Sequence, residues 1–391
     1  PDPGDNPGPP EPDPDTPPVT PIDPDPTPPP GPPVNPNPPN PDIPDPGPTP
    51  NPKPYTPGPS SDSKIILEGR IASLAYIAGI GNWLADHTYK SADMATKESN
   101  PLTHHAPSSG DQDHGWDPFA GVDAGVFWTH KGTKNKYKTF TFIAGMARQS
   151  YNPDWNSAFL FAVFADGGFA DYDVNGGYGT FGGPHISGDG SLRYLGGGIM
   201  ARQRWDNGFR IEASARAGQI RNKFTTYDLI APQAVNYEIE TPYYALHVGV
   251  GHEWMLSENS TIDLLVRYFW TKQDGDSYTF NFGQNLNQKV RFDDTISHRV
   301  RVGSRYTKMK TDRFSWYLGA SYEQELDSKN RGWIMGQPFE TPSLKGGTGI
   351  GEVGIIYRST ADKHFNIETG IQGHVGVRRG ISGGVRLGWE F

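Results

Sequence analysis

The sequence has no cysteine and no long apolar run. Because none of its 391 residues is a cysteine, disulfide bonds and thiolate metal sites are excluded, and folding in an oxidising compartment meets no unpaired thiol. Only 34% of the residues are hydrophobic and the mean hydropathy is −0.63. No run approaches the roughly 20 apolar residues of a membrane-spanning helix, so a helical membrane protein is excluded.

Proline and negative charge are concentrated in residues 1–60. This segment holds 29 of the 38 prolines, nine Asp or Glu residues and one Lys, so it carries −8 of the total net charge of −9. Such a composition cannot form a regular backbone hydrogen-bond ladder and favours extended polyproline II. We therefore expect a disordered, solvated spacer, and a ligand for SH3-type domains is the less favoured alternative.

A helical pattern follows the spacer. Ser61, Asp62 and Ser63 are good N-caps, and they predict a helix over residues 64–89 within a segment spanning 61–90. The helix would be about 39 Å long, enough to cross a membrane inside a pore, and Gly79 and Gly81 favour a break. An amphipathic helix on a domain surface is the alternative. Its apolar positions are Leu67, Ile71, Leu74, Ile77, Ala78 and Leu84.

Residues 91–115 form a polar connector, and twelve segments of alternating apolar and polar residues follow it. The last segment is the clearest: Ile381, Val385, Leu387, Trp389 and Phe391 share one face, whereas small or charged residues occupy the other. Alternation of this kind is compatible with a membrane β-barrel, in which only every second residue faces lipid. The remaining apolar faces include Val122–Trp128, Phe159–Val163, Ile262–Trp270 and Phe365–Val377.

Connections between these segments alternate in length. Short ones are expected at residues 150–157, 205–208, 257–260, 307–312 and 359–363, and long ones near 170–190, 220–241, 272–292 and 325–349. Two shorter links on the long side are expected at 131–136 and at Arg379-Gly380. Short turns on one side and longer loops on the other are typical of outer-membrane barrels. We therefore predict an all-β transmembrane fold over residues 116–391, a twelve-stranded antiparallel up-and-down β-barrel.

Charged residues on the opposite strand face would then line the lumen. A role in solvating a polar pore wall is at least as favoured for these charges as a role in guiding an acidic spacer through the barrel. These residues are Arg202, Arg216, Arg267, Arg301, Glu352, Arg358, Glu368 and Arg378.

The order of acidic spacer, helix and barrel resembles the C-terminal β-barrel translocator domain of autotransporters, or type V secretion proteins. The resemblance covers residues 64–391 and is most specific in Trp316–Leu326 and Gly347–Phe391. It implies an outer-membrane protein of a Gram-negative bacterium that exports and anchors an N-terminal passenger absent from this chain, with the helix in the lumen, no cofactor and no nucleic-acid partner. In such a helix Leu67, Arg70, Leu74, Ile77 and Asn82 would face the barrel wall.

The same resemblance implies an orientation and a set of partners. The passenger and spacer would lie on the cell surface and the C-terminus in the periplasm. Val385, Leu387, Trp389 and Phe391 would form the signal for the barrel-assembly machinery, which acts with periplasmic chaperones, and outer-membrane lipid would surround the strands.

Catalytic alternatives rest on weaker signals. His104, His105 and His114 with Asp111 and Asp113 match no ordered metal motif, and residues 176–179 lack the features of a phosphate loop. A barrel enzyme, a protease or phospholipase, would use loop residues such as Asp293, Asp294 and His298, and a porin is a further alternative. Some autotransporters cleave their helix at an Asn pair; Asn82 is followed by Trp83 here, so an anchored passenger is favoured.

Overall fold

The computed structural model describes residues 65–95, 115–131, 133–176, 186–230, 233–281, 287–328, 330–334, 336–340, 343–359 and 365–389. The chain divides into two units, Pro1–Thr56 and Pro57–Phe391, and every described residue belongs to the second. The predicted spacer, residues 96–114 of the predicted connector, and the terminal Phe391 lie outside the described residues.

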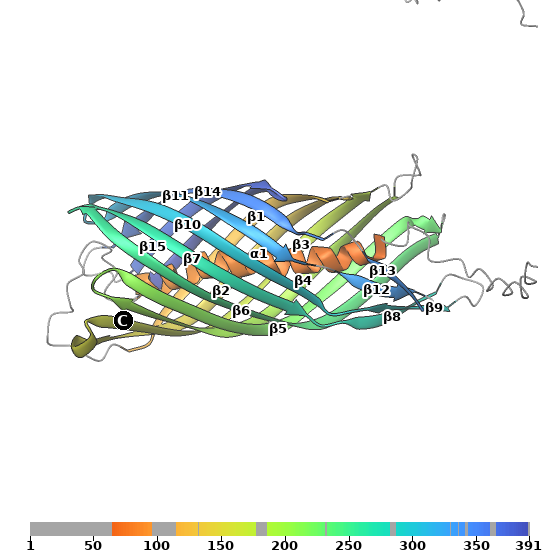
Figure 1. Ribbon diagram of the computed structural model, residues 1–391, viewed down its shortest axis with the longest axis horizontal. Coiled ribbons are helices and arrows are strands. Elements are labelled where there is room, and N and C mark those ends of the chain that lie inside the picture. Colours follow the sequence, from red (N-terminus) through yellow and green to blue (C-terminus); the bar gives the residue numbers. More distant parts are fainter. Residues whose placement is uncertain are drawn as a thin grey trace, which may run out of the picture. The chain divides into compact units, whose positions relative to one another are not determined.

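Twelve of the described strands form one closed antiparallel barrel, as the sequence predicts (Figure 1). Each strand pairs with its neighbours along the barrel, and β16 pairs with β1 from Phe119–Gly388 to Thr129–Arg378 to close it. The strands are β1 (Asp117–Lys131), β2 (Thr133–Asn152), β3 (Ser157–Gly176), β4 (Ile186–Trp205), β5 (Phe209–Ile230), β6 (Gln233–Ser257), β7 (Ser260–Gln273), β10 (Thr295–Thr311), β11 (Phe314–Asp327), β14 (Gly346–Arg358), β15 (Phe365–Gly376) and β16 (Arg378–Trp389).

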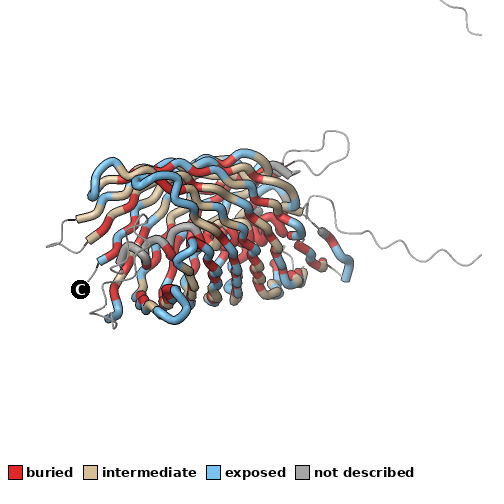
Figure 2. The backbone as a smooth tube through the Cα atoms, turned by 60° about the vertical axis from the view of Figure 1, so that its left-hand side comes forward, coloured by how far each residue is buried: buried red, intermediate tan, exposed pale blue. Residues whose placement is uncertain are grey.

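Burial alternates along the strands, as Figure 2 shows by colour. On β6, Leu246, Val248 and Val250 are exposed, whereas His247 and Gly249 between them are buried. The exposed faces of neighbouring strands join into a continuous apolar band around the barrel, because antiparallel pairing places outward residues side by side. This band is the surface that a lipid bilayer covers in transmembrane barrels.

Several predicted loops are strands in the structure. The segments 170–176, 186–190, 220–230 and 233–241, expected as loops, continue β3 to β6, which reach 20 to 25 residues. Their outward residues are charged rather than apolar, which hid the continuation. Cross-strand ion pairs link them, such as Arg221–Glu240 at 3.1 Å and Lys223–Glu238 at 2.9 Å.

A second, four-stranded sheet was also not expected, and it is formed by the β7–β10 and β11–β14 connections. It contains β8 (Asp276–Asn281), β9 (Asn287–Phe292), β12 (Arg331–Ile334) and β13 (Gln337–Glu340), in the order β13-β12-β9-β8. The hairpin β8–β9 lies between β7 and β10, and the hairpin β12–β13 lies between β11 and β14. The predicted loops 272–292 and 325–349 were therefore wrong in large part.

The short links also differ in detail. The β10–β11 turn falls at residues 312–313 rather than over 307–312, since β10 runs to Thr311. The β15–β16 bend falls at Gly376 and Val377 rather than at Arg379-Gly380, so Val377 does not belong to the outward face. Gly376 has φ of 134° and a Cβ there would lie 2.3 Å from the Gly347 carbonyl oxygen, which explains why the chain bends at a glycine. A short 3-10 helix, η2 (Pro153–Trp155), joins β2 to β3.

One helix, α1 (Ile65–Ala95), runs along the inside of the barrel (Figure 1). Its 31 residues span about 46 Å, longer than the sequence predicts. The helix is unbroken at Gly79 and Gly81, contrary to expectation. A Cβ at Gly79 would lie 2.8 Å from Nη1 of Arg378, and Gly81 lies against Arg216 and Arg299. Both glycines therefore make room for guanidinium groups of the wall. Among the described residues, no helix combines the length and apolarity needed to cross a membrane.

Candidate functional site

The lumen and its helix are the candidate site, and the two barrel ends differ. We call the end that carries β8, β9, β12 and β13 the loop end, and the opposite end, where β2–β3, β4–β5, β6–β7 and β10–β11 join by short links, the turn end. The helix begins at the loop end and ends at the turn end (Figure 1). It contacts β1 to β7, β10, β15 and β16.

At the loop end, hydrogen bonds from the wall hold the backbone of the first helical turns. The Tyr237 hydroxyl donates to the Ile66 carbonyl oxygen over 3.0 Å. The Asn222 amide donates to the Gly69 carbonyl oxygen over 2.6 Å and to Ser73 Oγ over 2.9 Å. These donors come from the strand extensions β5 and β6, so the extra strand length positions the helix.

The second sheet covers the same helical turns. Asn330 Nδ2, just before β12, donates to the Leu67 carbonyl oxygen over 3.0 Å. Arg70 donates to the Asp274 carbonyl oxygen over 2.6 Å and lies over the ring of Phe292 on β9, 5.8 Å from its centroid. Leu67 and Phe292 belong to one buried apolar cluster with Val290, Ile334 and Phe339. The sheet thus packs its apolar face over the helix N-terminus.

In the middle of the barrel the helix meets charged residues. Arg216 Nη2 donates to the Ile77 carbonyl oxygen over 2.8 Å, and its Nη1 pairs with Asp166 at 3.0 Å. Tyr76 donates to the carbonyl oxygens of Phe140 and Phe169 over 2.7 and 3.0 Å. The contact of Arg216 with a helix carbonyl was not foreseen from its position on β5.

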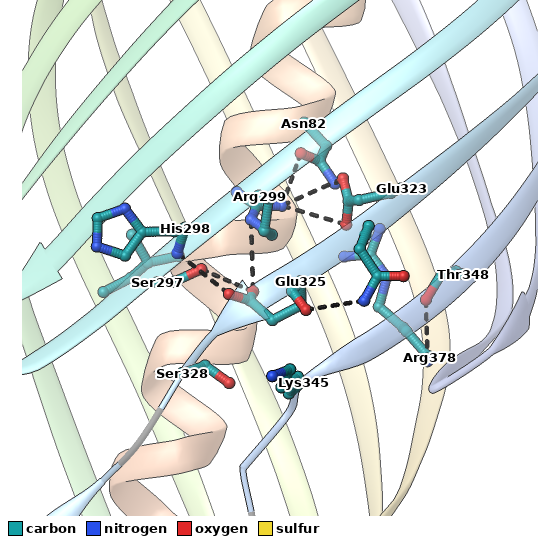
Figure 3. Close-up of polar contacts among 12 residues, drawn as sticks. Asn82, Ser297, His298, Arg299, Glu323, Glu325, Ser328, Lys345, Thr348 and Arg378 are labelled. Atoms are coloured by element: carbon teal, nitrogen blue, oxygen red, sulfur yellow. Dashed lines mark hydrogen bonds and ion pairs between the residues drawn. The ribbon is translucent and has the colours of Figure 1, made fainter.

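Asn82 connects the helix to a group of charged wall residues (Figure 3). Its Oδ1 accepts a hydrogen bond of 2.7 Å from Arg299 Nη1, and its Nδ2 donates to the Glu323 carboxylate. Arg299 also pairs with Glu323 at 3.4 Å and with Glu325 at 3.8 Å. Ser297 Oγ completes the group by donating to Glu325 over 2.7 Å. Both polar atoms of the Asn82 amide are therefore bound by charged side chains, and hydrogen bonds to charged groups are stronger than neutral ones.

Toward the turn end, Tyr89 is the helix residue whose contacts with the wall are described. The Tyr89 hydroxyl donates to the Ala213 carbonyl oxygen over 2.6 Å, and Arg202 lies over the Tyr89 ring at 5.9 Å. Arg202 is thus a lumen residue that contacts the helix.

The remaining predicted lumen charges project from the wall, and most of them contact other wall residues. Arg305 pairs with Glu352 at 2.5 Å and with Glu368 at 3.4 Å, and Arg386 also pairs with Glu368. Arg267 forms an ion pair with Glu212, Arg301 donates a hydrogen bond to Ser321, and Arg358 donates one to Ser315. Arg378 lies against Gly79 of the helix and over the Phe127 ring. The lumen arginines are therefore engaged with carboxylates, hydroxyls or the helix.

The five predicted helix residues are alike in burial. Leu67, Leu74 and Ile77 are buried side chains, as are Arg70 and Asn82. Sequence reasoning missed the wall partners of the helix, above all Asn222, Tyr237, Glu323 and Arg299. Polar residues at alternate positions of the strands gave a usable signal for facing the lumen, but nothing in the sequence indicated which of them reach the helix.

Val385, Leu387 and Trp389 of the last strand point outward and are 40%, 47% and 52% exposed. They continue the apolar band to the turn end, and Trp389 stacks on Phe365 of β15 with ring centroids 6.1 Å apart. The fourth member of this predicted signal, Phe391, lies outside the described residues.

The catalytic candidates are not brought together. Asp293 accepts from Trp333 Nε1 over 3.0 Å and pairs with Arg291, Asp294 pairs with Lys272 at 2.8 Å, and His298 bonds to Tyr268 over 2.7 Å. Hydrogen bonding to the Lys272 ammonium holds the pKa of Asp294 below its usual range. The His104, His105 and His114 group and residues 177–179 lie outside the described residues. No cluster of three or more metal-ligating side chains occurs in the ranges that the structure describes.

A closed twelve-stranded barrel with an apolar outer band, a charged lumen and a helix along its axis defines an outer-membrane translocator barrel. The autotransporter beta-domain family matches residues 122–370 of this chain. Because this match covers well over half of the sequence, the chain belongs to the autotransporter β-domain family and is an outer-membrane translocator domain of type V secretion.

Solved structures agree at the level of the fold. The translocator domain of the autotransporter NalP from Neisseria meningitidis is 12% identical, with a TM-score of 0.60, and the match covers 83% of this chain and 99% of that one. The β domain of the Bordetella autotransporter BrkA is 14% identical, with a TM-score of 0.53, over 71% of this chain and 99% of that one. No curated protein matches the sequence.

Proposed function

We propose that this domain exports a passenger linked to its N-terminus and then anchors it on the cell surface. The direction of the helix carries this proposal. Because α1 begins at the loop end and ends at the turn end, a passenger linked to the N-terminal side of the helix would emerge at the loop end. The loop end then faces the cell exterior, and the turn end, where β16 finishes, faces the periplasm.

The contacts of the helix support permanent anchoring. Hydrogen bonds from Asn222, Tyr237 and Asn330 hold its first turns, and both polar atoms of the Asn82 side chain are bound by Arg299 and Glu323. Cyclisation of an Asn requires its Nδ2 to approach its own carbonyl carbon, and a helical backbone with the amide held away from it opposes that approach. The passenger therefore stays attached.

We further propose that the domain has no catalytic chemistry and that its assembly uses the barrel-assembly machinery and periplasmic chaperones. Val385, Leu387, Trp389 and Phe391 form the signal for this assembly. A barrel enzyme and a porin are the competing functions. The engagement of Asp293, Asp294 and His298 with Trp333, Lys272 and Tyr268 weighs against the first, and the helix in the lumen weighs against the second.

The test is surface display in Gram-negative cells. A folded reporter with an epitope is fused before Pro1, and a second epitope is inserted between Glu258 and Asn259 in the turn-end link from β6 to β7, which leaves the terminal Phe391 in place. We expect protease added to intact cells to remove the first epitope and to leave the second until the outer membrane is permeabilised. The matched control replaces Asp293, Asp294 and His298 by Ala and should display the reporter equally. A reporter that stays protected in intact cells while the barrel is folded would contradict the proposal.

A further inference from the structure

The outer surface of the barrel carries a hollow of about 520 Å³ near the seam where β16 meets β1. Strand register explains it. One row of outward residues across five strands reads Ile371, Gly383, Ala124, Phe140 and Phe169. The two small residues in the centre form a floor, while Ile371 on one side and the stacked rings of Phe140 and Phe169 on the other, 5.2 Å apart, form the walls.

The size and the position of this hollow fit an acyl chain. Its volume lies within the range of small-molecule binding sites, and it opens on the band that lipid covers. The row nearer the loop end consists of Ile381, Val126 and Lys138, and the next row contains Trp128, which is 37% exposed. An exposed Trp followed by charged residues marks the interface between hydrocarbon and headgroups. The hollow therefore lies directly beneath the headgroup level of the leaflet at the loop end.

A group of basic side chains stands above it. Lys134, Lys136 and Lys138 are successive outward residues of β2, and Arg379 lies opposite Trp128 on β16. The outward carboxylates of β3 in the same rows are Asp173, opposite Lys136, and Asp171, opposite Lys138. Four cations against two anions leave this patch with a formal charge of +2.

Its lysines differ from the other outward cations of the strand extensions. Arg221 and Lys223 on β5 form ion pairs of 2.9 to 3.3 Å with Glu238 and Glu240 on β6. Within the described part of the chain, the three β2 lysines form no ion pair closer than 4 Å. They remain available to an anion from outside the protein, and the anion that a membrane presents at this depth is a lipid phosphate.

We propose that the hollow and the β2 lysines together bind a phosphorylated lipid of the leaflet at the loop end. One acyl chain lies over Gly383 and Ala124 between Ile371 and Phe140, and the headgroup phosphate contacts Lys136 and Lys138. Lysine is a compact point charge on a flexible stem, so it follows a phosphate without requiring one fixed geometry. Because the site lies across β16, β1 and β2, the bound lipid also bridges the seam that closes the barrel.

The test uses the full chain, purified in a neutral detergent and folded as judged by heat-modifiable migration. Native mass spectrometry measures retention of dimyristoyl phosphatidic acid, of dimyristoylglycerol with the same chains but no phosphate, and of glycerol phosphate with no chains. We expect the unaltered protein to retain the phosphatidic acid at least tenfold better than either of the other two.

Two variants separate the parts of the site. Lys136→Gln combined with Lys138→Gln removes the charge, and Ala124→Phe fills the floor; each should weaken retention of phosphatidic acid about tenfold or more. The controls are Lys308→Gln with Lys310→Gln at the turn end of β10, and Ala213→Phe on the outward face of β5, and both should bind as the unaltered protein does.

Equal binding of dimyristoylglycerol, or undiminished binding by the double lysine variant, would overturn the phosphate contact. Undiminished binding by Ala124→Phe, with Gly383→Val as a second filled form, would overturn the acyl-chain site. Glycerol phosphate bound as tightly as the lipid would replace the proposal by a site for a free anion.

Discussion

Replacing Asn82 by Leu should loosen the helix without unfolding the barrel. The substitution keeps the side-chain volume similar but removes two hydrogen bonds, one from Arg299 at 2.7 Å and one to Glu323. Hydrogen bonds to charged groups contribute about 1.5–3 kcal/mol each. Arg299 and Glu323 keep their mutual ion pair at 3.4 Å, so we expect the docked helix to lose about 2–4 kcal/mol. That loss corresponds to an increase of about 30-fold to 1,000-fold in the undocked population.

Planar-bilayer recordings measure this population, because an undocked helix leaves an open lumen. The unaltered chain should show small or rare openings, and a chain lacking residues 1–95 should show large, steady ones, since the strands keep their hydrogen bonds without the helix. The Asn82→Leu variant should switch between the two levels. Ser315→Ala, which removes a hydrogen bond from Arg358 within the wall, serves as the control and should resemble the unaltered chain.

The reasoning fails if Asn82→Leu conducts like the unaltered chain while the deletion conducts freely. Contacts elsewhere along the helix would then dominate its docking. Equal conductance from the deletion and the full chain would have a larger consequence, because the helix would not be the element that closes the lumen.

Three further predictions concern assembly, the lipid face and pH. Removing Phe391 should lower the amount of folded, heat-modifiable protein in the outer membrane, because the last outward position of β16 carries the assembly signal, and unchanged levels would contradict that role. Val266→Arg, between Val250 and Val302 in the middle of the apolar band, should lower the free energy of unfolding by about 2–4 kcal/mol in a refolding titration. Val375→Arg, beside the loop-end bend, should cost about 0–1 kcal/mol, and lumenal Gln372→Arg should cost little. Equal costs at Val266 and Gln372 would refute the assignment of Val266 to the lipid-facing side. The Lys272–Asp294 pair depresses the pKa of Asp294, so its contribution is present above about pH 3.9, the unfolded value, and disappears as the pH falls through the folded pKa. Lys272→Met should accelerate amide exchange in β8–β9 at pH 7, and this acceleration should shrink as the pH falls below about 3.9. An acceleration that did not shrink would exclude the pair as the cause.

The sequence allowed the barrel to be predicted because outward residues inside the lipid band are apolar at every second position. The same rule failed beyond the band. On β5 the outward positions change from Ile211 and Ala213 to Arg221 and Lys223, so alternation of polarity disappears although the strand continues. The second sheet was missed for another reason: β9 pairs with β12, which lies about 40 residues further along the chain, and such a long-range pairing leaves no local pattern.

For the site, the sequence allowed only one prediction, namely which wall residues face the lumen. Alternation placed Arg216, Arg267 and Glu368 in the lumen, but partners within the lumen depend on strand stagger, which short-range patterns do not reveal. The expected break at Gly79 and Gly81 illustrates the limit. Intrinsic propensity counts glycine as a helix-weakening residue, yet here the absent side chains let Arg378, Arg216 and Arg299 approach the helix closely, so tertiary contacts overrode propensity.

The contacts along α1 change in character from one end of the barrel to the other, and this gradient decides how the helix can leave. At the loop end, Leu67 and Arg70 are enclosed by the second sheet, and Tyr237 and Asn222 bond to backbone oxygens that water would otherwise have to satisfy. In the middle, Asn82 and Ile77 meet guanidinium groups that also have carboxylate partners, so loss of one contact leaves no isolated charge. We therefore expect loosening to begin in the polar middle, while the loop end still holds. A single substitution in the middle thus yields intermittent openings, and steady opening requires removal of the whole helix.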